Sequence, residues 1–346
     1  MEDLRIGVIG FGLRRSIALH AHRPGEGARI VAVVDPAERA RREVAEQVGA
    51  ECAVHASLDE FLAHDLGAVM VLSPDHTPAE ITQRTLSAGL PTFCEKPLAI
   101  SLEEADAILG AAHTHRTKLY VGHNMRHMPV VRQMKSLIDS GAIGKVRSVW
   151  CRHFVGAGGD FYLEDISLLN LRLDNGVLAT YQQCHFTPDY WRNYTVIGDA
   201  GRLENIGDSG GDQIHLWTSR RSGARTPDRV EVIERGDGGH GGADPSLVAE
   251  FLRFVREGGP TEVSTAAARQ AVRPPAWARN PSAPTAHPGG SPNWRRNSSP
   301  TSTAGRRSPS GPLPARLRAR RARSADQGWC AVRRRSRRWA RPRCRH

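Results

Sequence analysis

The chain has 346 residues, of which 48 are Lys or Arg and 36 are Asp or Glu, and its formal net charge is +12 at pH 7. Residues 272–346 hold 19 of the basic residues, all Arg, and one acid, so residues 1–271 hold 29 basic and 35 acidic residues. This uneven charge argues against a nucleic-acid-binding protein that is basic throughout. A membrane protein is not expected either, because no apolar run reaches about 18 residues.

The first 122 residues alternate between short apolar runs and amphipathic stretches. The runs lack polar alternation, as expected of strands covered on both faces, and lie at Leu4–Gly10, Arg29–Asp35, Ala68–Ser73, Pro91–Glu95 and Lys118–His123. Helical periodicity lies between them, at Arg14–His22, Ala37–Val48, Pro78–Ala88 and Leu102–His115. We therefore predict an α/β domain over residues 1–122, a Rossmann-type, doubly wound parallel sheet.

Residues 123–271 show a different pattern, with many strand-like runs and few helices. Helices are expected at Val130–Ser140 and Ser246–Glu257. The strand-like runs are Val146–Val155, Ile166–Leu173, Val177–Cys184, Tyr194–Ile197, Ile214–Thr218 and Arg229–Ile233. Because Asp174-Asn175-Gly176 is typical of a hairpin turn, we predict an α+β second domain with a mostly antiparallel, open sheet.

Residues 272–346 lose all periodicity. They include 11 Pro and only four residues of the Leu, Ile, Val and Phe set, a composition that cannot bury a core, so we expect a disordered tail. Lys, Ile, Phe, Tyr, Met and Glu are absent, which suggests that the tail is an out-of-frame reading of GC-rich DNA. Its Arg runs would attract polyanions at low salt, but no nucleic-acid-binding fold surrounds them, so no specific nucleic acid partner is expected.

The six cysteines show no Cys-x-x-Cys spacing. We therefore expect neither a metal site nor a disulfide framework, but thiols that stay reduced in the cytoplasm.

A glycine-rich turn follows the first predicted strand. Gly10 permits a sharp turn, and Gly12 permits close approach of the backbone to a pyrophosphate at the start of a helix. Arg15 replaces the third glycine of the usual pattern, so either the helix packs more loosely or this side chain turns outward. Asp35, 25 residues after Gly10, is placed to accept hydrogen bonds from an adenosine ribose. Asp35 favours NAD, because its carboxylate would repel the 2′-phosphate of NADP. Since Arg39 is only four residues away in the sequence and could bind that phosphate, NADP remains an alternative.

Lys96 lies at the carboxyl end of a predicted buried strand, where ligands bind in folds of this kind. Desolvation there would lower the pKa of its ammonium group and suit proton exchange with an alcohol. The alternative is a solvated loop lysine that pairs with Glu95.

Residues 1–271 resemble the Gfo/Idh/MocA oxidoreductases, the family of glucose–fructose oxidoreductase and the inositol dehydrogenases. The resemblance rests on Gly10-Phe11-Gly12, Asp35, Ser73-Pro74-Asp75-His76-Thr77, Glu95-Lys96-Pro97 and Gly122-His123-Asn124-Met125-Arg126. It implies hydride transfer between NAD or NADP and a hydroxyl of a sugar, polyol or cyclitol, with Lys96 as the catalytic residue. It also implies that the second domain makes a homo-oligomer if it folds.

The resemblance assigns roles to particular residues. Those expected to bind the cofactor are Gly10, Phe11, Gly12, Leu13, Asp35, Ser73, Pro74, His76, Glu95, Lys96 and Asn124. Arg126 would lie beside the substrate at the domain junction. His185 and His240 are weaker candidates for substrate contacts, the first at a strand end and the second in a glycine-rich loop.

One feature of the family is missing. Its members carry a Gly-x-x-x-Asp-x-x-x-His helix whose Asp and His join the lysine, but here residues 161–165 run almost directly into Ile166. The nearest formal match, over residues 156–164, ends in Glu. Two hypotheses therefore stay open: an active dehydrogenase, and a catalytically impaired dinucleotide-binding remnant or sensor. We expect residues 1–122 to be well ordered and the second domain to be partly compromised.

Overall fold

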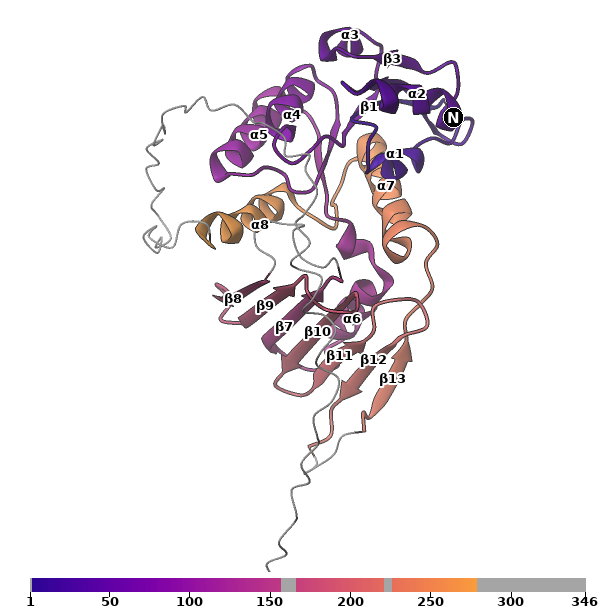
Figure 1. Cartoon of the computed structure of the whole chain (residues 1–346). Coiled ribbons are helices and arrows are strands. Elements are labelled where there is room, and N and C mark those ends of the chain that lie inside the picture. Colours follow the sequence, from indigo (N-terminus) through magenta and orange to yellow (C-terminus); the bar gives the residue numbers. More distant parts are fainter. Residues whose placement is uncertain (1, 157–165, 221–225, 279–346) are drawn as a thin grey trace, which may run out of the picture. The chain divides into compact units, whose positions relative to one another are not determined.

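The computed structural model describes residues 2–156, 166–220 and 226–278, which form two sheets and the helices around them (Figure 1). The near-match to the family's catalytic helix and most of the predicted tail lie outside these residues. Within the described ranges, none of the helices is both long and apolar enough to span a bilayer.

The first sheet is parallel and six-stranded, with the order β3-β2-β1-β4-β5-β6. Its strands are β1 (Leu4–Ile9), β2 (Ala28–Val34), β3 (Ala53–His55), β4 (Ala68–Val71), β5 (Thr92–Glu95) and β6 (Leu119–Gly122). The strand order reverses between β1 and β4, so the predicted doubly wound sheet is confirmed. Ligands bind such sheets at the carboxyl ends of the strands beside this reversal.

Helices cover both faces of this sheet. They are α1 (Arg15–Leu19), α2 (Glu38–Gln47), α3 (Leu58–Leu62), α4 (Pro78–Ser87) and α5 (Leu102–His115). Successive strand residues point to opposite faces: Val8 packs in a core with α1 and α2, whereas Ile9 packs in a core with α3 and α4. The short elements β3 and α3 were not predicted, because each spans too few residues to show a period.

Two C-terminal helices also pack on the first sheet. Helix α7 (Gly239–Glu257) places Leu247 and Phe251 in the core that contains Val8, and α8 (Thr265–Ala278) places Ala268 in a core with Cys94 of β5. Helix α8 continues past residue 272, so the expected loss of regular structure at that position is wrong. The apolar residues Val263, Ala268 and Val272 anchor it before the composition changes.

The second sheet has seven strands in the order β13-β12-β11-β10-β7-β9-β8. They are β7 (Val146–Phe154), β8 (Ile166–Arg172), β9 (Leu178–Cys184), β10 (Trp191–Gly198), β11 (Arg202–Ile206), β12 (Gln213–Trp217) and β13 (Arg229–Val232). Only β7 and β9 pair in parallel, so the mostly antiparallel sheet is confirmed. Helix α6 (Pro129–Asp139) packs on one face through Val130, Met134 and Leu137.

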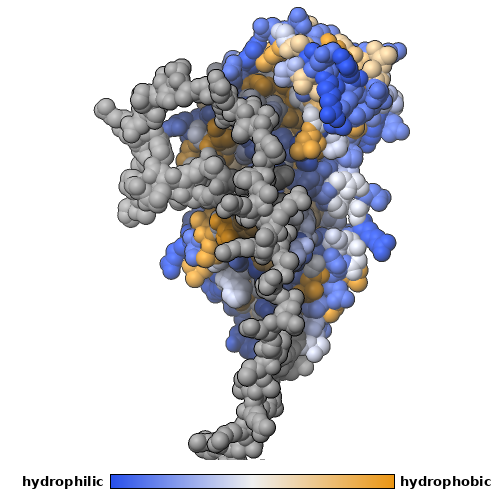
Figure 2. All heavy atoms as spheres, viewed as in Figure 1, coloured by the Kyte–Doolittle hydropathy of each residue, from blue (hydrophilic) through white to orange (hydrophobic). Residues whose placement is uncertain are grey.

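The other face of this sheet is open and carries several apolar side chains among polar ones. Trp150, Ile166, Leu168 and Leu178 lie on it together, as the pairing of β7, β9 and β8 shows, and each is at least half exposed. Hydrophobic residues are visible on the surface at the level of β8 and β9 (Figure 2). Part of this sheet is thus exposed among the described residues.

Candidate functional site

A groove of about 800 Å³ lies at the carboxyl ends of the strands of the first sheet. Most residues predicted to bind the cofactor line it, namely Gly10, Gly12, Leu13, Asp35, Ser73, Pro74, His76, Glu95 and Lys96. Phe11 does not, because its side chain is fully buried in the core between the sheet and α7. Asn124 lines a second cavity instead.

The two glycines of the turn after β1 are needed for different reasons. Gly10 has a φ of +89°, and a Cβ atom there would lie 3.0 Å from backbone atoms of Leu72 and Ser73, so only glycine fits without strain. A Cβ atom on Gly12 would meet no protein atom within 4 Å. The space beside Gly12 opens into the groove, where Leu13 is 92 % exposed.

Asp35 shapes this turn from the end of β2. Its buried carboxylate accepts hydrogen bonds from the backbone N–H groups of Phe11 and Ala37, both at 2.8 Å. The backbone of Phe11, not its ring, thus ties the turn to Asp35, which lines the groove. Arg39 is not among the residues that line the groove; it forms an ion pair with Glu43 at 3.2 Å.

Arg15 turns away from the groove. Its guanidinium lies 3.1 Å from the carboxylate of Glu43 and 3.2 Å from Gln47 on α2. The substitution of the third glycine is therefore accommodated by an outward side chain.

Glu95 is bound to Arg14 and not to the lysine that follows it. Arg14 Nε donates to Glu95 Oε1 at 2.8 Å, and the backbone N–H of Lys96 donates to Oε2 at 2.8 Å. Of the alternative, a solvated loop lysine that pairs with Glu95, the structure shows the exposed lysine but gives the Glu95 carboxylate other partners. The expected desolvation of Lys96 is wrong, because its side chain is exposed. The role of Arg14 could not be foreseen from local pattern, because its partner Glu95 is 81 residues away.

A second cavity, of about 600 Å³, adjoins the strand end that carries Lys96. It brings together five predicted residues, Lys96, Asn124, Arg126, His185 and His240. The residues that sequence reasoning missed include His123, His153, Tyr181, Gln183, Tyr190 and Arg192. Lys96 alone of these lines both this cavity and the groove, so it lies where the two meet.

The lining of this cavity combines cations with neutral imidazoles. Burial, together with nearby Arg126 and Lys96, lowers the pKa of His123 to about 4. Burial, together with Arg192 and His185, lowers the pKa of His153 to about 4. Among the described residues that line the cavity there is no Asp or Glu, and no group of three His, Cys, Asp or Glu is placed to hold a metal ion in residues 2–156, 166–220 and 226–278. The site is thus suited to hold hydroxyl and carbonyl oxygens.

The histidine in the glycine-rich loop belongs to a polar cluster. His240 Nδ1 lies 3.0 Å from Oδ2 of Asp244, which is 2 % exposed, and Asn124 Nδ2 donates to Oδ1 of Asp244 at 2.9 Å. Arg14 lies 3.9 Å from the same carboxylate. Sequence reasoning missed Asp244, although its position four residues after His240, where a helix begins, was a usable signal.

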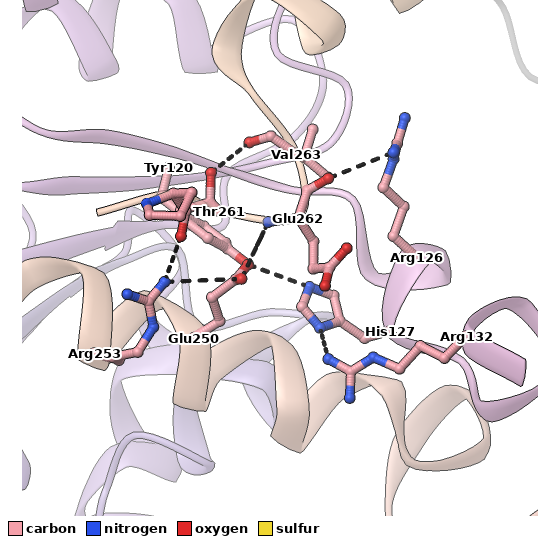
Figure 3. A network of polar contacts seen from close by, with 10 residues as sticks. Tyr120, Arg126, His127, Arg132, Glu250, Arg253, Thr261, Glu262 and Val263 are labelled. Atoms are coloured by element: carbon pink, nitrogen blue, oxygen red, sulfur yellow. Dashed lines mark hydrogen bonds and ion pairs between the residues drawn. The ribbon is translucent and has the colours of Figure 1, made fainter. Parts of the chain in front are cut away.

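A hydrogen-bond network holds the segment that carries Asn124 and Arg126 (Figure 3). This segment, the 3₁₀ helix η1 (Asn124–His127), follows β6. Glu250 of α7 accepts from the Tyr120 hydroxyl at 2.8 Å and lies 3.6 Å from His127 Nε2. Helix α7 therefore fixes η1, and with it the wall of the cavity.

The amino-terminal part of the chain is similar to known oxidoreductases. Residues 4–123 match the model of an oxidoreductase family with an NAD-binding Rossmann fold, named GFO_IDH_MocA. An inositol 2-dehydrogenase of Rhizobium meliloti is 26% identical over 246 residues, which cover 66% of this chain and 72% of that protein.

Other relatives match over a shorter length. Inositol 2-dehydrogenase 1 of Saccharopolyspora erythraea is 36% identical over 156 residues, covering 43% of this chain and 45% of the relative. The 2,7-anhydro-N-acetylneuraminate hydratase of Mediterraneibacter gnavus is 31% identical over 177 residues, covering 51% of this chain and 46% of the relative. The chain thus spans about half the length of these two relatives.

Solved structures share the fold. A levoglucosan dehydrogenase in complex with NADH superposes with a TM-score of 0.68 at 18% identity, over 78% of this chain and 94% of the other. A myo-inositol 2-dehydrogenase from Lactobacillus plantarum gives a TM-score of 0.64 at 19% identity, over 80% of this chain and 96% of the other.

Proposed function

Since the chain belongs, through residues 4–123, to the Gfo/Idh/MocA oxidoreductase family with its NAD-binding Rossmann fold, we propose that it is an NAD-dependent dehydrogenase of a sugar, polyol or cyclitol. The observation that carries the proposal is the position of Lys96, which lines both the groove and the adjoining cavity. A substrate in the cavity and a dinucleotide in the groove would meet at this residue.

The residues of the groove fit a dinucleotide. The open space at Gly12 leaves room for a pyrophosphate against the backbone, and the exposed Leu13 offers an apolar contact. Ser73 Oγ is buried and has no hydrogen-bond partner among the described residues. When bound, NAD supplies a nicotinamide ring that accepts or donates the hydride.

We further propose NAD as the cofactor in preference to NADP. The carboxylate of Asp35 lines the groove and would repel a 2′-phosphate. Arg39, the residue that could offset this repulsion, pairs with Glu43.

Lys96 positions the reacting hydroxyl in this proposal. Its ammonium group donates a hydrogen bond to the hydroxyl oxygen and stabilises the negative charge that develops there. Asn124 and the neutral imidazoles of His123 and His153 offer further hydrogen bonds to a polyhydroxylated substrate. The inositol 2-dehydrogenases among the relatives support this class of substrate.

The test uses the purified full chain. We expect NADH fluorescence to report saturable binding, and NAD⁺ reduction to be detected with at least one of myo-inositol, glucose and levoglucosan. Lys96→Ala should lower kcat/KM by about 10²–10⁴-fold, whereas Lys135→Ala, an exposed lysine of α6, should leave it unchanged. NADH binding without turnover of any sugar or polyol would favour the remnant or sensor hypothesis, and the absence of NADH binding would contradict both.

A further inference from the structure

His240 occupies a backbone conformation that a histidine adopts only at a cost. Its φ is +52° and its ψ is 43°, inside a loop in which Gly238, Gly241 and Gly242 also have positive φ. A non-glycine residue in this left-handed region costs about 1–2 kcal/mol. A glycine at this position would avoid the strain, so the conformation of the loop does not require a histidine. A functional role of the imidazole would explain why a histidine is present.

The surrounding glycines let the loop close tightly against Asp244. A Cβ atom on Gly239 would lie 2.4 Å from Asp244 Oδ2, and one on Gly242 would lie 2.6 Å from Gly236 Cα. Side chains at these positions would push the loop away from Asp244 and Gly236. The glycines therefore serve to bring His240 and Asp244 together.

The environment of Asp244 fixes which nitrogen of His240 carries the proton. Burial by itself would raise the pKa of Asp244, but the hydrogen bonds from His240 and Asn124 and the charge of Arg14 outweigh it, so that the pKa lies below its usual value. An ionised carboxylate only accepts hydrogen bonds, so Nδ1 of the 3.0 Å contact must carry the hydrogen. A neutral His240 then has its free electron pair on Nε2.

His240 lines the same cavity as Lys96. The ammonium form of Lys96 can donate to a substrate oxygen but has no electron pair with which to accept its proton. We propose that His240, oriented by Asp244, is the acid–base residue that exchanges the hydroxyl proton of the substrate. This inference rests on the proposed dehydrogenase function and adds a second residue to its chemistry.

The proposed step is balanced. As the alcohol is oxidised, its O–H bond breaks and the proton forms an N–H bond with His240 Nε2. The electron pair of the O–H bond becomes the second bond of the carbonyl group, and the C–H electron pair leaves as the hydride that NAD⁺ takes up. Asp244 stabilises the resulting imidazolium, as a buried carboxylate does beside a histidine base.

Several charged or titratable groups lie around this pair. Those that line the cavity are Lys96, His123, Arg126, His153, His185 and Arg192, and those behind or beside the loop are Asp244, Arg14, Glu95 and His20. Of these, Asp244 is the carboxylate in contact with the His240 ring, at 3.0 Å.

The first test reads the tautomer directly. Nitrogen-15 NMR of the full chain labelled at histidine, with the His240 signals assigned by their loss in His240→Gln, should show a protonated Nδ1 and a pyridine-type Nε2. Asp244→Asn should abolish this preference, and His113→Gln, an exposed position on α5, should leave it unchanged. A protonated Nε2 in the unsubstituted chain would overturn the proposal, whether or not the chain binds NADH.

The second test separates a chemical role from a structural one. His240→Gly removes the imidazole while it relieves the backbone strain, and should lower kcat by about 10²–10⁴-fold while the Kd for NADH changes less than about threefold. Added imidazole should restore part of the activity of this variant, in proportion to the concentration of the neutral base. An unchanged kcat, or a loss of activity that imidazole does not restore at any pH, would overturn the assignment of His240 as the proton acceptor.

Discussion

At the scale of single residues, the two glycines after β1 have different roles: Gly10 is needed for folding, whereas Gly12 is proposed to make room for the cofactor. Gly12→Val places its side chain in open space, so the free energy of unfolding should change by less than about 0.5 kcal/mol. The same side chain would fill the space proposed for the pyrophosphate, and the affinity for NADH should fall at least about tenfold. Urea denaturation and an NADH titration measure the two effects.

Gly10→Val is the matched comparison. Here the substitution imposes a positive φ on a branched residue and brings its Cβ to 3.0 Å from the backbone of Leu72. We expect it to destabilise the chain by about 2–4 kcal/mol. If Gly12→Val lost as much stability as Gly10→Val, the space beside Gly12 would not be open.

The sequence predicted some residues of the site and not others for a physical reason. Gly10, Gly12 and Lys96 follow apolar runs, so their places at strand ends could be read from local pattern. Arg14 acts through a partner 81 residues away, and nothing local indicates that contact. Asp244 also bonds Asn124, 120 residues away, but its contact with His240, four residues before it, could have been inferred from the spacing. Lys96 was expected to be desolvated because it lies at the end of a buried strand. This expectation is wrong, because the strand end opens onto a cavity that leaves the side chain exposed.

At the scale of elements, η1 depends on the network between β6 and α7. The Tyr120 hydroxyl donates to Glu250 at 2.8 Å, and this carboxylate also accepts from the backbone N–H of Glu262 at 3.1 Å (Figure 3). Tyr120→Phe should cost about 1 kcal/mol of stability, and Glu250→Ala about 1–3 kcal/mol. A double-mutant cycle should give a coupling of about 1 kcal/mol, and additive effects would show that the hydrogen bond does not contribute.

Helices and strands were predicted correctly where the element was long enough to show the period of its apolar residues. The parallel strands and the helices α2, α4 and α5 follow from apolar patterning, whereas β11 (Arg202–Ile206) carries charged residues that hide its alternation. The kinked segment at the start of α7 is not helical at His240, Gly241 and Gly242, so the regular helix begins after Gly242, close to the predicted Ser246. The tertiary contact with Asp244, and not helix propensity, fixes that segment.

At the scale of the whole molecule, partly buried histidines make stability depend on pH. Burial lowers the pKa of both His123 and His153 to about 4 from an ordinary 6.5, so the unfolded chain binds more protons than the folded chain between these values. Their stabilising effect is complete above about pH 6.5 and is lost as the pH falls toward 4. Between pH 7.5 and pH 5 we expect a loss of about 2–3 kcal/mol in the free energy of unfolding, after allowing for partial exposure.

Urea denaturation at the two pH values measures this loss. His123→Asn should reduce the pH dependence, whereas His113→Gln on the exposed end of α5 should leave it as it is. An equal free energy of unfolding at pH 5 and pH 7.5 would contradict the burial of these imidazoles.

The open face of the second sheet bears on assembly. Trp150 and Leu168 are 51 % and 65 % exposed on this face, and apolar patches of this kind often mark contacts between protein chains. We propose a homo-oligomer formed through this face. Light scattering should show a multimer that Trp150→Glu combined with Leu168→Glu converts to a monomer, while Val54→Glu, on β3 of the first sheet, leaves it intact. A monomeric unsubstituted chain at micromolar concentration would contradict the proposal.

We propose above all that the groove beside Gly12 holds a dinucleotide whose reactive ring reaches Lys96. A crystal structure of the chain grown with NADH is the decisive experiment. We expect the pyrophosphate against Gly12, the adenosine ribose beside Asp35, and the nicotinamide at the junction lined by Lys96. A fully ordered groove that stays empty at saturating NADH, or a dinucleotide bound elsewhere, would contradict it.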